Sequence, residues 1–183
     1  MKTTIISHAG KIKSTGAVLF AAEGESKKDF LPESLAHTAE SFEPGAFKGK
    51  TGEMVYVPLK GISLIIVGIG KDAAAETLRR AAASAVRSVI KHELPSLTVV
   101  VPDMDNLAAE TSLRSAAEGI LLGNYSFDRY KTKKKKIVTE AAFVSFAKNA
   151  ASILKDTQTV CENTILCRDL VNGTSDEVTP EAI

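Results

Sequence analysis

The sequence has 183 residues, of which 44% are hydrophobic and 25% are charged, so it can form one globular domain with a core and a short appendage. The formal net charge of +1 creates no overall field that would favour nucleic acid or a membrane surface as a partner. No apolar run approaches the roughly 20 residues of a membrane-spanning helix, and the N-terminal residues turn polar too soon for a signal peptide.

Strand and helix patterns alternate along the chain. Segments with strand character span residues 3–7, 17–21, 54–58, 62–67, 97–101 and 137–146. The runs at 62–67 and 97–101 are almost continuously apolar and rich in β-branched residues, which is typical of strands buried on both faces of a parallel sheet. The pattern therefore predicts an α/β fold with a mostly parallel central sheet.

A helix is predicted between the two buried strands, with Asp72 as its N-cap. Its inner positions are Leu78, Ala82, Ala85, Val86 and Val89, and its outer positions are Glu76, Arg80, Arg87 and Lys91. This strand–helix–strand unit implies a right-handed parallel crossover. A second helix over residues 112–122 is expected to stop at Gly123. Its inner positions are Leu113, Ala116, Ala117 and Ile120.

A third helix is predicted over residues 149–170, with apolar side chains spread widely around it. Such a helix suits a connector that packs on more than one side, or only in part. We therefore predict an α/β domain over residues 1–148, followed over residues 149–183 by the connector helix and the start of a further domain. Thr179 and Pro180 would suit the first turn of another helix, so we expect this sequence to be part of a longer polypeptide.

Gly68 and Gly70 open the sharpest local motif, Gly-Ile-Gly-Lys-Asp-Ala, which follows a buried strand and precedes a helix. It fits the relaxed dinucleotide fingerprint G-x-G-x-x-A, in which glycines let the backbone approach a phosphate at a helix N-terminus. Asp72 would place a negative charge in this cradle, and no acidic residue ends the next strand at the expected distance. The alternative interpretation is a tight turn between strand and helix.

The segment from Lys131 to Lys136 is the strongest charge cluster, with five lysines in six residues. Tyr125, Phe127 and Tyr130 come just before it. Basic residues beside aromatic rings can bind nucleic acid through phosphate contacts and base stacking. The alternative is a solvated loop that joins a helix to a strand and is anchored to the core by its aromatic residues.

No set of side chains in the sequence forms a recognisable catalytic or metal centre. The candidates are His8, His37, His92, Cys161, Cys167, Asp103 and Asp105. The histidines lack metal-ligand spacing, the cysteines have no histidine partner, and the aspartates fit a loop. On a helix the cysteines would be about 9 Å apart along the axis, too far for a disulfide, which favours a reducing, intracellular location. We expect no catalytic, cofactor-binding or metal-binding residue.

Four segments resemble the cytosolic leucyl aminopeptidase family, a family of metallo-aminopeptidases. They are Phe-Lys-Gly-Lys-Thr-Gly-Glu at 47–53, Leu-Ile-Ile-Val-Gly-Ile-Gly-Lys at 64–71, Glu-Gly-Ile-Leu-Leu-Gly-Asn-Tyr-Ser-Phe-Asp-Arg-Tyr-Lys-Thr at 118–132, and Cys-Arg-Asp-Leu-Val-Asn-Gly-Thr-Ser-Asp-Glu-Val-Thr-Pro at 167–180. The third and fourth are specific in combination and in order. Thr174 and Asp176 stand where proline and asparagine are usual in the family, a departure confined to the linker.

The resemblance implies the N-terminal part of a two-part enzyme. Its front domain would be macro-domain-like, a central sheet with helices on both faces, and a long helix would then lead to a catalytic domain. In the family, that catalytic domain holds two divalent metals, zinc or manganese, on a lysine and several carboxylates, and its hallmark is an N-T-D-A-E-G-R segment. This sequence contains no such segment, so no metal-binding or catalytic residue is carried over and no cofactor is expected in it. The longer enzyme would remove N-terminal amino acids from peptides by two-metal hydrolysis.

The implied role of this chain is non-catalytic: a cytoplasmic domain that serves hexamer assembly and access to the active sites. Its partners would be the catalytic domain of the same polypeptide and other copies of the enzyme, and peptide substrates would bind only through the catalytic domain. One alternative is a nucleic-acid-binding module that uses the loop from Lys131 to Lys136, since some family members bind DNA. The other is a macro-like domain that binds ADP-ribose or a nucleotide at the Gly68 turn.

Overall fold

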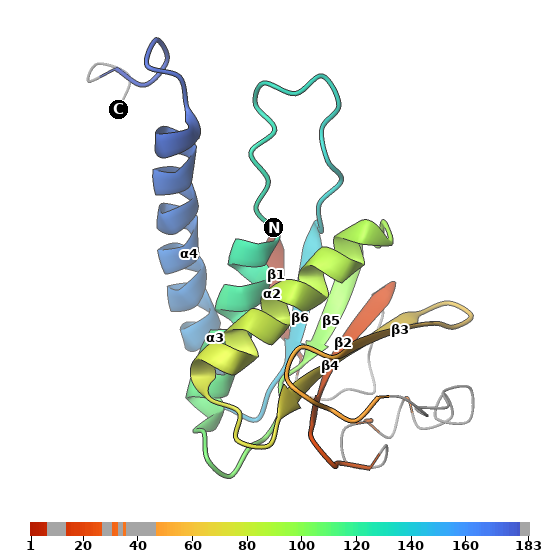
Figure 1. The fold of residues 1–183 in the computed structure, drawn as a ribbon. Helices are drawn as coiled ribbons and strands as arrows, with labels where there is room; N and C mark the ends of the chain where they lie inside the picture. The colour runs from red at the N-terminus through yellow and green to blue at the C-terminus, as the bar shows by residue number, and fades with distance from the viewer. Residues whose placement is uncertain (7–13, 27–30, 33–34, 36–46, 180–183) are drawn as a thin grey trace.

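The computed structural model describes residues 1–6, 14–26, 31–32, 35 and 47–179. Among them, six strands form one sheet in the order β1-β6-β5-β2-β4-β3 (Figure 1). The strands are β1 (Lys2–Ile6), β2 (Gly16–Ala22), β3 (Met54–Pro58), β4 (Ser63–Gly70), β5 (Ser96–Val100) and β6 (Glu140–Val144). The helices are α2 (Ala75–Lys91), α3 (Ala109–Gly123) and α4 (Ala150–Asn172). Neighbouring strands run parallel except β3, which is antiparallel to β4. The predicted α/β class with a mostly parallel sheet is confirmed.

The centre of the sheet is formed by β2 and its two neighbours. Val18 of β2 lies in register with Ile65 of β4 on one side and with Val99 of β5 on the other. All eight residues of β4 are buried, as the continuous apolar run predicted. Because β2 lies between β4 and β5, the connection through α2 must cross over β2 before the chain re-enters the sheet.

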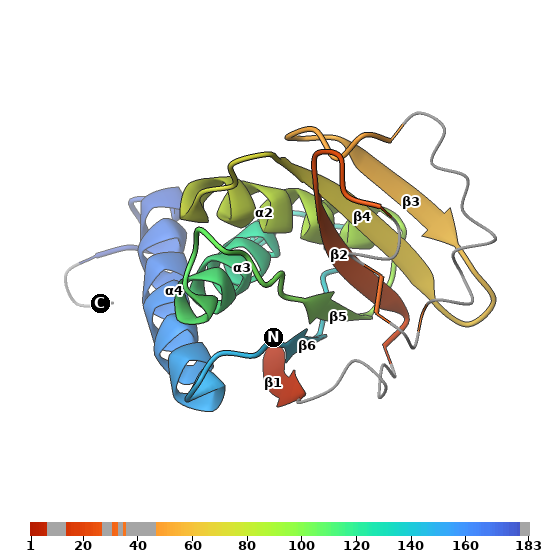
Figure 2. The same cartoon turned by 90° about the horizontal axis from the view of Figure 1, so that it is seen from below.

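The helices α2 and α3 pack on one face of this sheet (Figure 2). Every residue predicted for the inner faces of α2 and α3 is buried, and the predicted outer positions of α2 are exposed. On the other face, Leu31 and Leu35 join Leu19, Leu64 and Ile66 in a second apolar cluster. No residue of α2, α3 or α4 belongs to this second cluster, so among the described residues helices cover one face of the sheet, where helices on both faces were expected.

Two glycines let α3 lie directly against α2. A Cβ atom at Gly119 would collide with the backbone oxygen of Arg79 and would lie 2.7 Å from the Cβ of Ala82. A Cβ atom at Gly123 would lie 2.7 Å from the Val86 side chain. The helix α3 ends at Gly123 as predicted, but Gly123 is its last helical residue and the cap position belongs to Asn124. Gly123 is required because α2 occupies the space of its missing side chain.

The start of α2 also differs from the prediction. Asp72 does not cap this helix, which begins at Ala75 with Ala74 at the cap position and no side-chain bond to its end. Ala73 is buried, and its carbonyl accepts a hydrogen bond of 3.3 Å from the amide of Asn106. This anchor holds the chain in an extended link beyond Asp72, so the helix starts later than its sequence pattern indicated.

The last strand is shorter than predicted, because β6 begins at Glu140 and not at Ile137. The preceding Val138 is buried, but its backbone groups bond to the side chain of Asn124 instead of to a neighbouring strand. Its carbonyl accepts from the Nδ2 atom of Asn124, and its N–H donates to the Oδ1 atom of Asn124, both at 2.9 Å. Apolar character alone therefore placed the start of this strand too early.

The buried residues of α4 all lie in its first half, and the helix contacts α3 and β1. Its buried residues are Ala150, Leu154, Thr157 and Cys161. Val160, Leu166 and Val171 have exposed fractions of 56%, 55% and 85%. The helix is thus a partly packed connector, and the functional boundary near residue 149 stays a prediction. Neither α4 nor any other helix in the described ranges is long and apolar enough to cross a membrane.

Replacing Gly119 by alanine should destabilise the domain. The added methyl group would force α2 and α3 apart, a strain of about 1–3 kcal/mol that outweighs the gain of about 1 kcal/mol in helix propensity. Arg114→Ala, on the exposed side of the same helix, should change stability by less than about 0.5 kcal/mol. Urea unfolding of the three proteins measures both effects, and a Gly119→Ala variant more stable than the parent would contradict the close helix contact.

Candidate functional site

Gly68 and Gly70 lie within β4 and receive the loop that contains Lys50. A Cβ atom at Gly68 would collide with the backbone oxygen of Lys50, and Gly70 has a φ of +79°, which favours glycine. The N–H of Gly68 donates to the carbonyl of Glu53 at 2.8 Å, and the N–H of Gly70 donates to the carbonyl of Gly49 at 2.9 Å. The N–H groups of both glycines are therefore already bonded within the chain.

The Glu53 carboxylate organises this loop. It accepts hydrogen bonds from the backbone N–H groups of Lys48 and Lys50 at 2.8 Å and 3.1 Å, and the bond from Lys48 is the main cause that lowers the pKa of Glu53. The helix α2 begins only at Ala75. The dinucleotide interpretation is therefore wrong for this motif. The alternative, a tight turn between strand and helix, is incomplete. Gly70 is the last residue of β4, and both glycines let the loop at 47–53 lie close against this strand.

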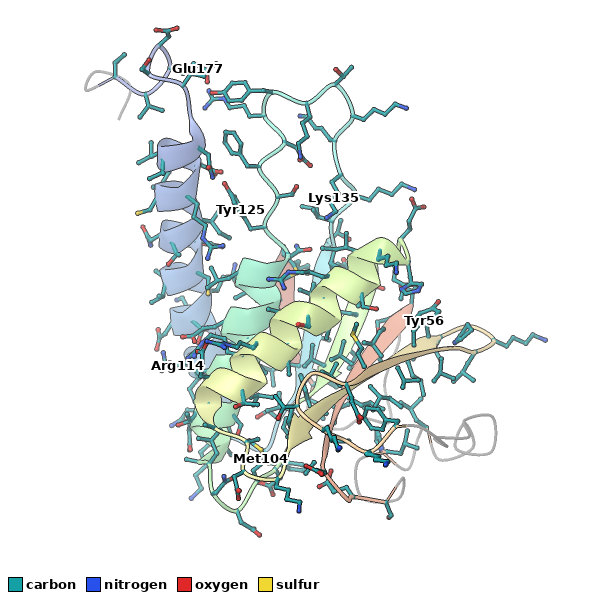
Figure 3. All side chains as sticks on the ribbon, in the orientation of Figure 1. Tyr56, Met104, Arg114, Tyr125, Lys135 and Glu177 are labelled. Carbon is teal, nitrogen blue, oxygen red and sulfur yellow. The ribbon has the colours of Figure 1, made fainter. Side chains whose placement is uncertain are left out.

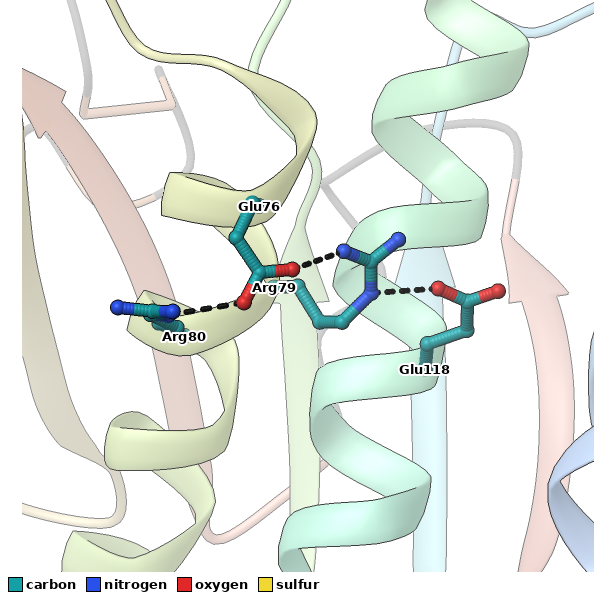
Figure 4. Close-up of polar contacts among 4 residues, drawn as sticks. All are labelled: Glu76, Arg79, Arg80 and Glu118. Carbon is teal, nitrogen blue, oxygen red and sulfur yellow. Dashed lines mark hydrogen bonds and ion pairs between the residues drawn. The ribbon is translucent and has the colours of Figure 1, made fainter. Parts of the chain in front are cut away.

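A charged network joins the first turns of α2 to α3 (Figure 4). The Nε atom of Arg79 donates to Glu118 at 2.6 Å, and its Nη1 atom pairs with Glu76. The Nε atom of Arg80 donates to the other oxygen of Glu76 at 2.8 Å. Glu118 raises the pKa of Arg79, and Arg80 lowers the pKa of Glu76. These charges satisfy one another, so they brace the two helices and leave no free acid or base.

Between α3 and β6 the chain forms a long projection, residues 125–137, which we call the arm (Figure 1). Asn124 closes the base of the arm through its two bonds to Val138, and both residues are buried. Lys136 adds an ion pair of 2.7 Å with Glu93, just beyond α2. From this fixed base the arm rises beside the far half of α4.

The tip of the arm is organised by Asp128. Its carboxylate accepts from the Nζ atom of Lys131 at 2.9 Å and from the backbone N–H of Lys135 at 2.8 Å. These bonds, with that from Lys131 the largest, lower the pKa of Asp128 from its ordinary value of 3.8 to about 2. The carboxylate thus holds the turn of the arm and is not available to a ligand.

The tyrosines of the arm bind α4 and the turn beyond it (Figure 3). The hydroxyl of Tyr125 donates to the carboxylate of Asp169 at 2.7 Å. The hydroxyl of Tyr130 donates to the carboxylate of Glu177 at 2.8 Å. The prediction that aromatic residues anchor this loop is confirmed, but the anchor is α4 and its following turn instead of the core.

Every residue of the arm from Lys131 to Lys136 is exposed. Lys131 and Lys136 form ion pairs with Asp128 and Glu93, whereas the other three lysines have no ion-pair partner among the described residues. The hydroxyls of both tyrosines are bound to α4 and its following turn, and the Arg168 guanidinium faces the ring of Tyr125, whereas half of the Tyr130 side chain is exposed. The interpretation of the arm as a nucleic-acid-binding loop stays a prediction.

His92 has a structural position at the end of α2. Its ring stacks on Tyr56 with the ring centres 3.6 Å apart, and its Nδ1 atom lies 2.8 Å from the carbonyl oxygen of Ser88. These contacts join the end of the helix to the edge strand β3. The other two histidines, His8 and His37, lie outside the described residues.

The cysteines and aspartates singled out from the sequence are not brought together. Cys161 is buried, and burial raises the pKa of its thiol to about 11, whereas Cys167 is exposed. Both thiols are free. Asp103 and Asp105 are exposed in the link after β5. Within the ranges that the structure describes, no three His, Cys, Asp or Glu side chains form a group that could hold a metal ion.

Sequence reasoning missed three polar residues on which the arm depends. Asn124, Asp169 and Glu177 bond to partners that are 14, 44 and 47 residues away in the chain. No local pattern marks such pairs. The one available signal was that all three residues fall in the segments at 118–132 and 167–180, which carry the family resemblance.

Comparison with known proteins gives a consistent picture. The model of the "Cytosol aminopeptidase family, N-terminal domain" matches residues 17–134. A probable cytosol aminopeptidase of Aquifex aeolicus is 31% identical over 177 residues, which are 93% of this chain and 36% of that protein. One of Protochlamydia amoebophila is 27% identical over 150 residues, 76% of this chain and 30% of that protein. This chain therefore spans about a third of the length of these relatives.

The fold is also similar to a solved structure. A variant of tomato leucine aminopeptidase superposes with a TM-score of 0.84 at 20% sequence identity, over the whole of this chain and 40% of that one. At this level of identity the likeness concerns the fold. It extends through α4, beyond the residues that the family model matches.

In the folded protein, Asp128 should titrate near pH 2. Because its folded pKa lies below the ordinary value of 3.8, the stabilisation from its bonds is present above 3.8 and is lost as the pH falls through about 2. In a two-dimensional NMR titration, the amide signal of Lys135 should shift with a midpoint of about 2. The same shift should be absent in Asp128→Asn. A midpoint at the ordinary carboxylate value would show that these bonds do not form in solution.

Proposed function

Because the chain belongs to the cytosol aminopeptidase family and corresponds to its N-terminal domain, we propose that it is a non-catalytic domain of a metal-dependent aminopeptidase. The observation that carries this proposal is the match over residues 17–134, which runs from β2 into the arm. The resemblance inferred from the four sequence segments is thereby confirmed. The chain spans about a third of the relatives' length, which leaves room for a separate catalytic part.

The absence of the family's metal-binding hallmark from the sequence supports the non-catalytic role. The acidic residues that could attract attention, Glu53, Glu76 and Asp128, hold parts of the fold through hydrogen bonds and ion pairs. In the part of the chain that the structure describes, no group of His, Cys, Asp or Glu side chains fits a metal centre. Zinc or manganese, and the peptide substrate, would bind in the catalytic domain of the same polypeptide.

A role in assembly and in access to the active sites is supported by the surface of α4. Val160 and Val171 are both exposed and, three turns apart, share one side of the helix. Phe146, just before α4, has an exposed fraction of 73%. Apolar side chains at such positions can supply contacts to another part of an enzyme or to another copy in a hexamer. The relatives named cytosol aminopeptidase support a cytoplasmic location.

The purified chain should not hydrolyse leucyl-p-nitroanilide, with or without added manganese or zinc, because its sequence lacks the segment that is the hallmark of the family's metal-binding domain. The release of p-nitroaniline measures this directly. A mock purification sets the background, and the full-length Aquifex aeolicus relative serves as the positive control. Metal-dependent turnover that follows the chain through gel filtration would contradict the non-catalytic role.

The assembly role can be tested in the Aquifex aeolicus relative, which is 31% identical over 177 residues. Deleting its matching region should lower the number of subunits in the oligomer, because contacts between copies would be lost; light scattering gives this number as the oligomer mass divided by the mass of one subunit. Replacing that region with this chain should restore the number of subunits. Circular dichroism checks that the deletion variant is folded, and a folded variant that keeps the full number of subunits and its activity would oppose an assembly role.

A further inference from the structure

The far half of α4 has little support from the body of the domain beyond a hydrogen bond of 3.4 Å from the Arg168 guanidinium to the carbonyl of Leu122 in α3. Its buried residues end at Cys161, and none of the described α4 residues after that position is fully buried. A helix end without tertiary contacts frays readily. The arm rises along this half of the helix (Figure 1), and two sets of contacts join them.

The first set surrounds Tyr125, at the start of the arm. Its hydroxyl donates to Asp169 at 2.7 Å and accepts from the Nδ2 atom of Asn172 at 3.3 Å. The Arg168 guanidinium lies 5.7 Å from the centre of the Tyr125 ring, a distance suited to a cation–π contact. Burial, and then the bond to Asp169, raises the pKa of Tyr125. Three side chains in the last turns of α4 thus meet one half-buried tyrosine.

The second set lies beyond the end of the helix, at the turn formed by residues 174–178, which we call the exit turn. Tyr130 donates from its hydroxyl to Glu177 at 2.8 Å and accepts from the backbone N–H of Thr174 at 2.9 Å. Arg129 forms an ion pair with the same glutamate at 3.1 Å. The arm therefore holds the exit of the chain as well as the helix.

The arm can hold α4 and the exit turn in place because its own base and tip are fixed. Its base is closed by the two bonds between Asn124 and Val138 and by the ion pair between Lys136 and Glu93. Its tip is tied internally by Asp128. A single exposed ion pair contributes little, but contacts between the same two segments reinforce one another.

We propose that the arm is a strut that fixes the direction in which the chain leaves α4. In a longer protein, whatever follows would then be held at a set angle to the sheet. This consequence rests on the proposed function, whereas the strut is a property of this chain alone. It also assigns the tyrosines of the arm a positioning role in place of a stacking role toward a ligand.

Hydrogen exchange followed by mass spectrometry tests the strut. In the double variant Tyr125→Phe/Tyr130→Phe, exchange in residues 162–178 should become about tenfold faster, because two hydroxyls no longer bond to α4 and its exit turn. Exchange in α2 and β4 and the melting temperature should stay unchanged, since neither hydroxyl contacts the core. Lys133→Gln, a change of charge on the same arm, should leave residues 162–178 as in the parent.

The variant Glu177→Gln approaches the same contacts from the other side. It should speed exchange around the exit turn while Tyr125 still holds Asp169. Unchanged exchange in residues 162–178 of the double variant would overturn the strut. Faster exchange throughout the domain would overturn it as well, because the tyrosines would then support general stability.

A distance measurement tests the direction itself. Spin labels at Arg87→Cys on α2 and Asp176→Cys on the exit turn, both exposed positions, should give a narrow distance distribution in a Cys167→Ser background. The double tyrosine variant should broaden it, and an unbroadened distribution would contradict the proposal. These readouts do not depend on activity or assembly. Catalytic activity of this chain would therefore refute the proposed function without affecting the strut. Unchanged exchange and distances in the tyrosine variant would refute the strut without affecting the proposed function.

Discussion

The burial of β4 on both faces sets the requirements that the other elements meet. A parallel strand that is apolar along its whole length must be covered from two sides, and all eight residues of β4 are buried. The helices α2 and α3 cover one face, and the cluster with Leu31 and Leu35 lies on the other. The antiparallel β3 then closes one edge of the sheet, and its Val55 and Val57 lie in register with Ile66 and Leu64 of β4. The order of strands, the crossover and the long helices follow from this cover.

Four glycines allow the covering elements to pack closely, two between α2 and α3 and two at the end of β4. Gly119 and Gly123 let α3 touch the backbone of α2, and Gly68 and Gly70 let the loop at 47–53 touch β4. The missing side chain permits approach by any backbone or by a phosphate, so the pattern of glycines cannot distinguish a ligand from a neighbouring loop. The decision comes from the N–H groups, which here bond within the chain. A sequence pattern that fits a dinucleotide site is thus satisfied by packing.

The sequence predicted the elements that local periodicity defines. The strands around Ile65 and Val99 and the inner faces of α2 and α3 were found because burial repeats at fixed intervals along a chain. The errors arose where a distant residue intervened. Asn106 holds Ala73 before α2 begins, and Asn124 takes the backbone of Val138 away from β6. Such contacts join residues that are far apart in the chain, and no local pattern records them.

The four segments that carry the family resemblance form two contacts in space. The loop at 47–53 lies on Gly68 and Gly70 of the segment at 64–71. The arm, in the segment at 118–132, bonds through its tyrosines to α4 and its exit turn in the segment at 167–180. The first contact belongs to the core and needs no explanation beyond packing.

The second contact is different in kind, because Asp169 and Glu177 lie past the last buried residue of α4. Their side chains bond to Tyr125, Arg129 and Tyr130 instead of packing in the core. Core stability alone therefore does not account for the residues at these positions. The proposed strut does account for them, because their bonds to the arm hold the far half of α4 and its exit turn in one place.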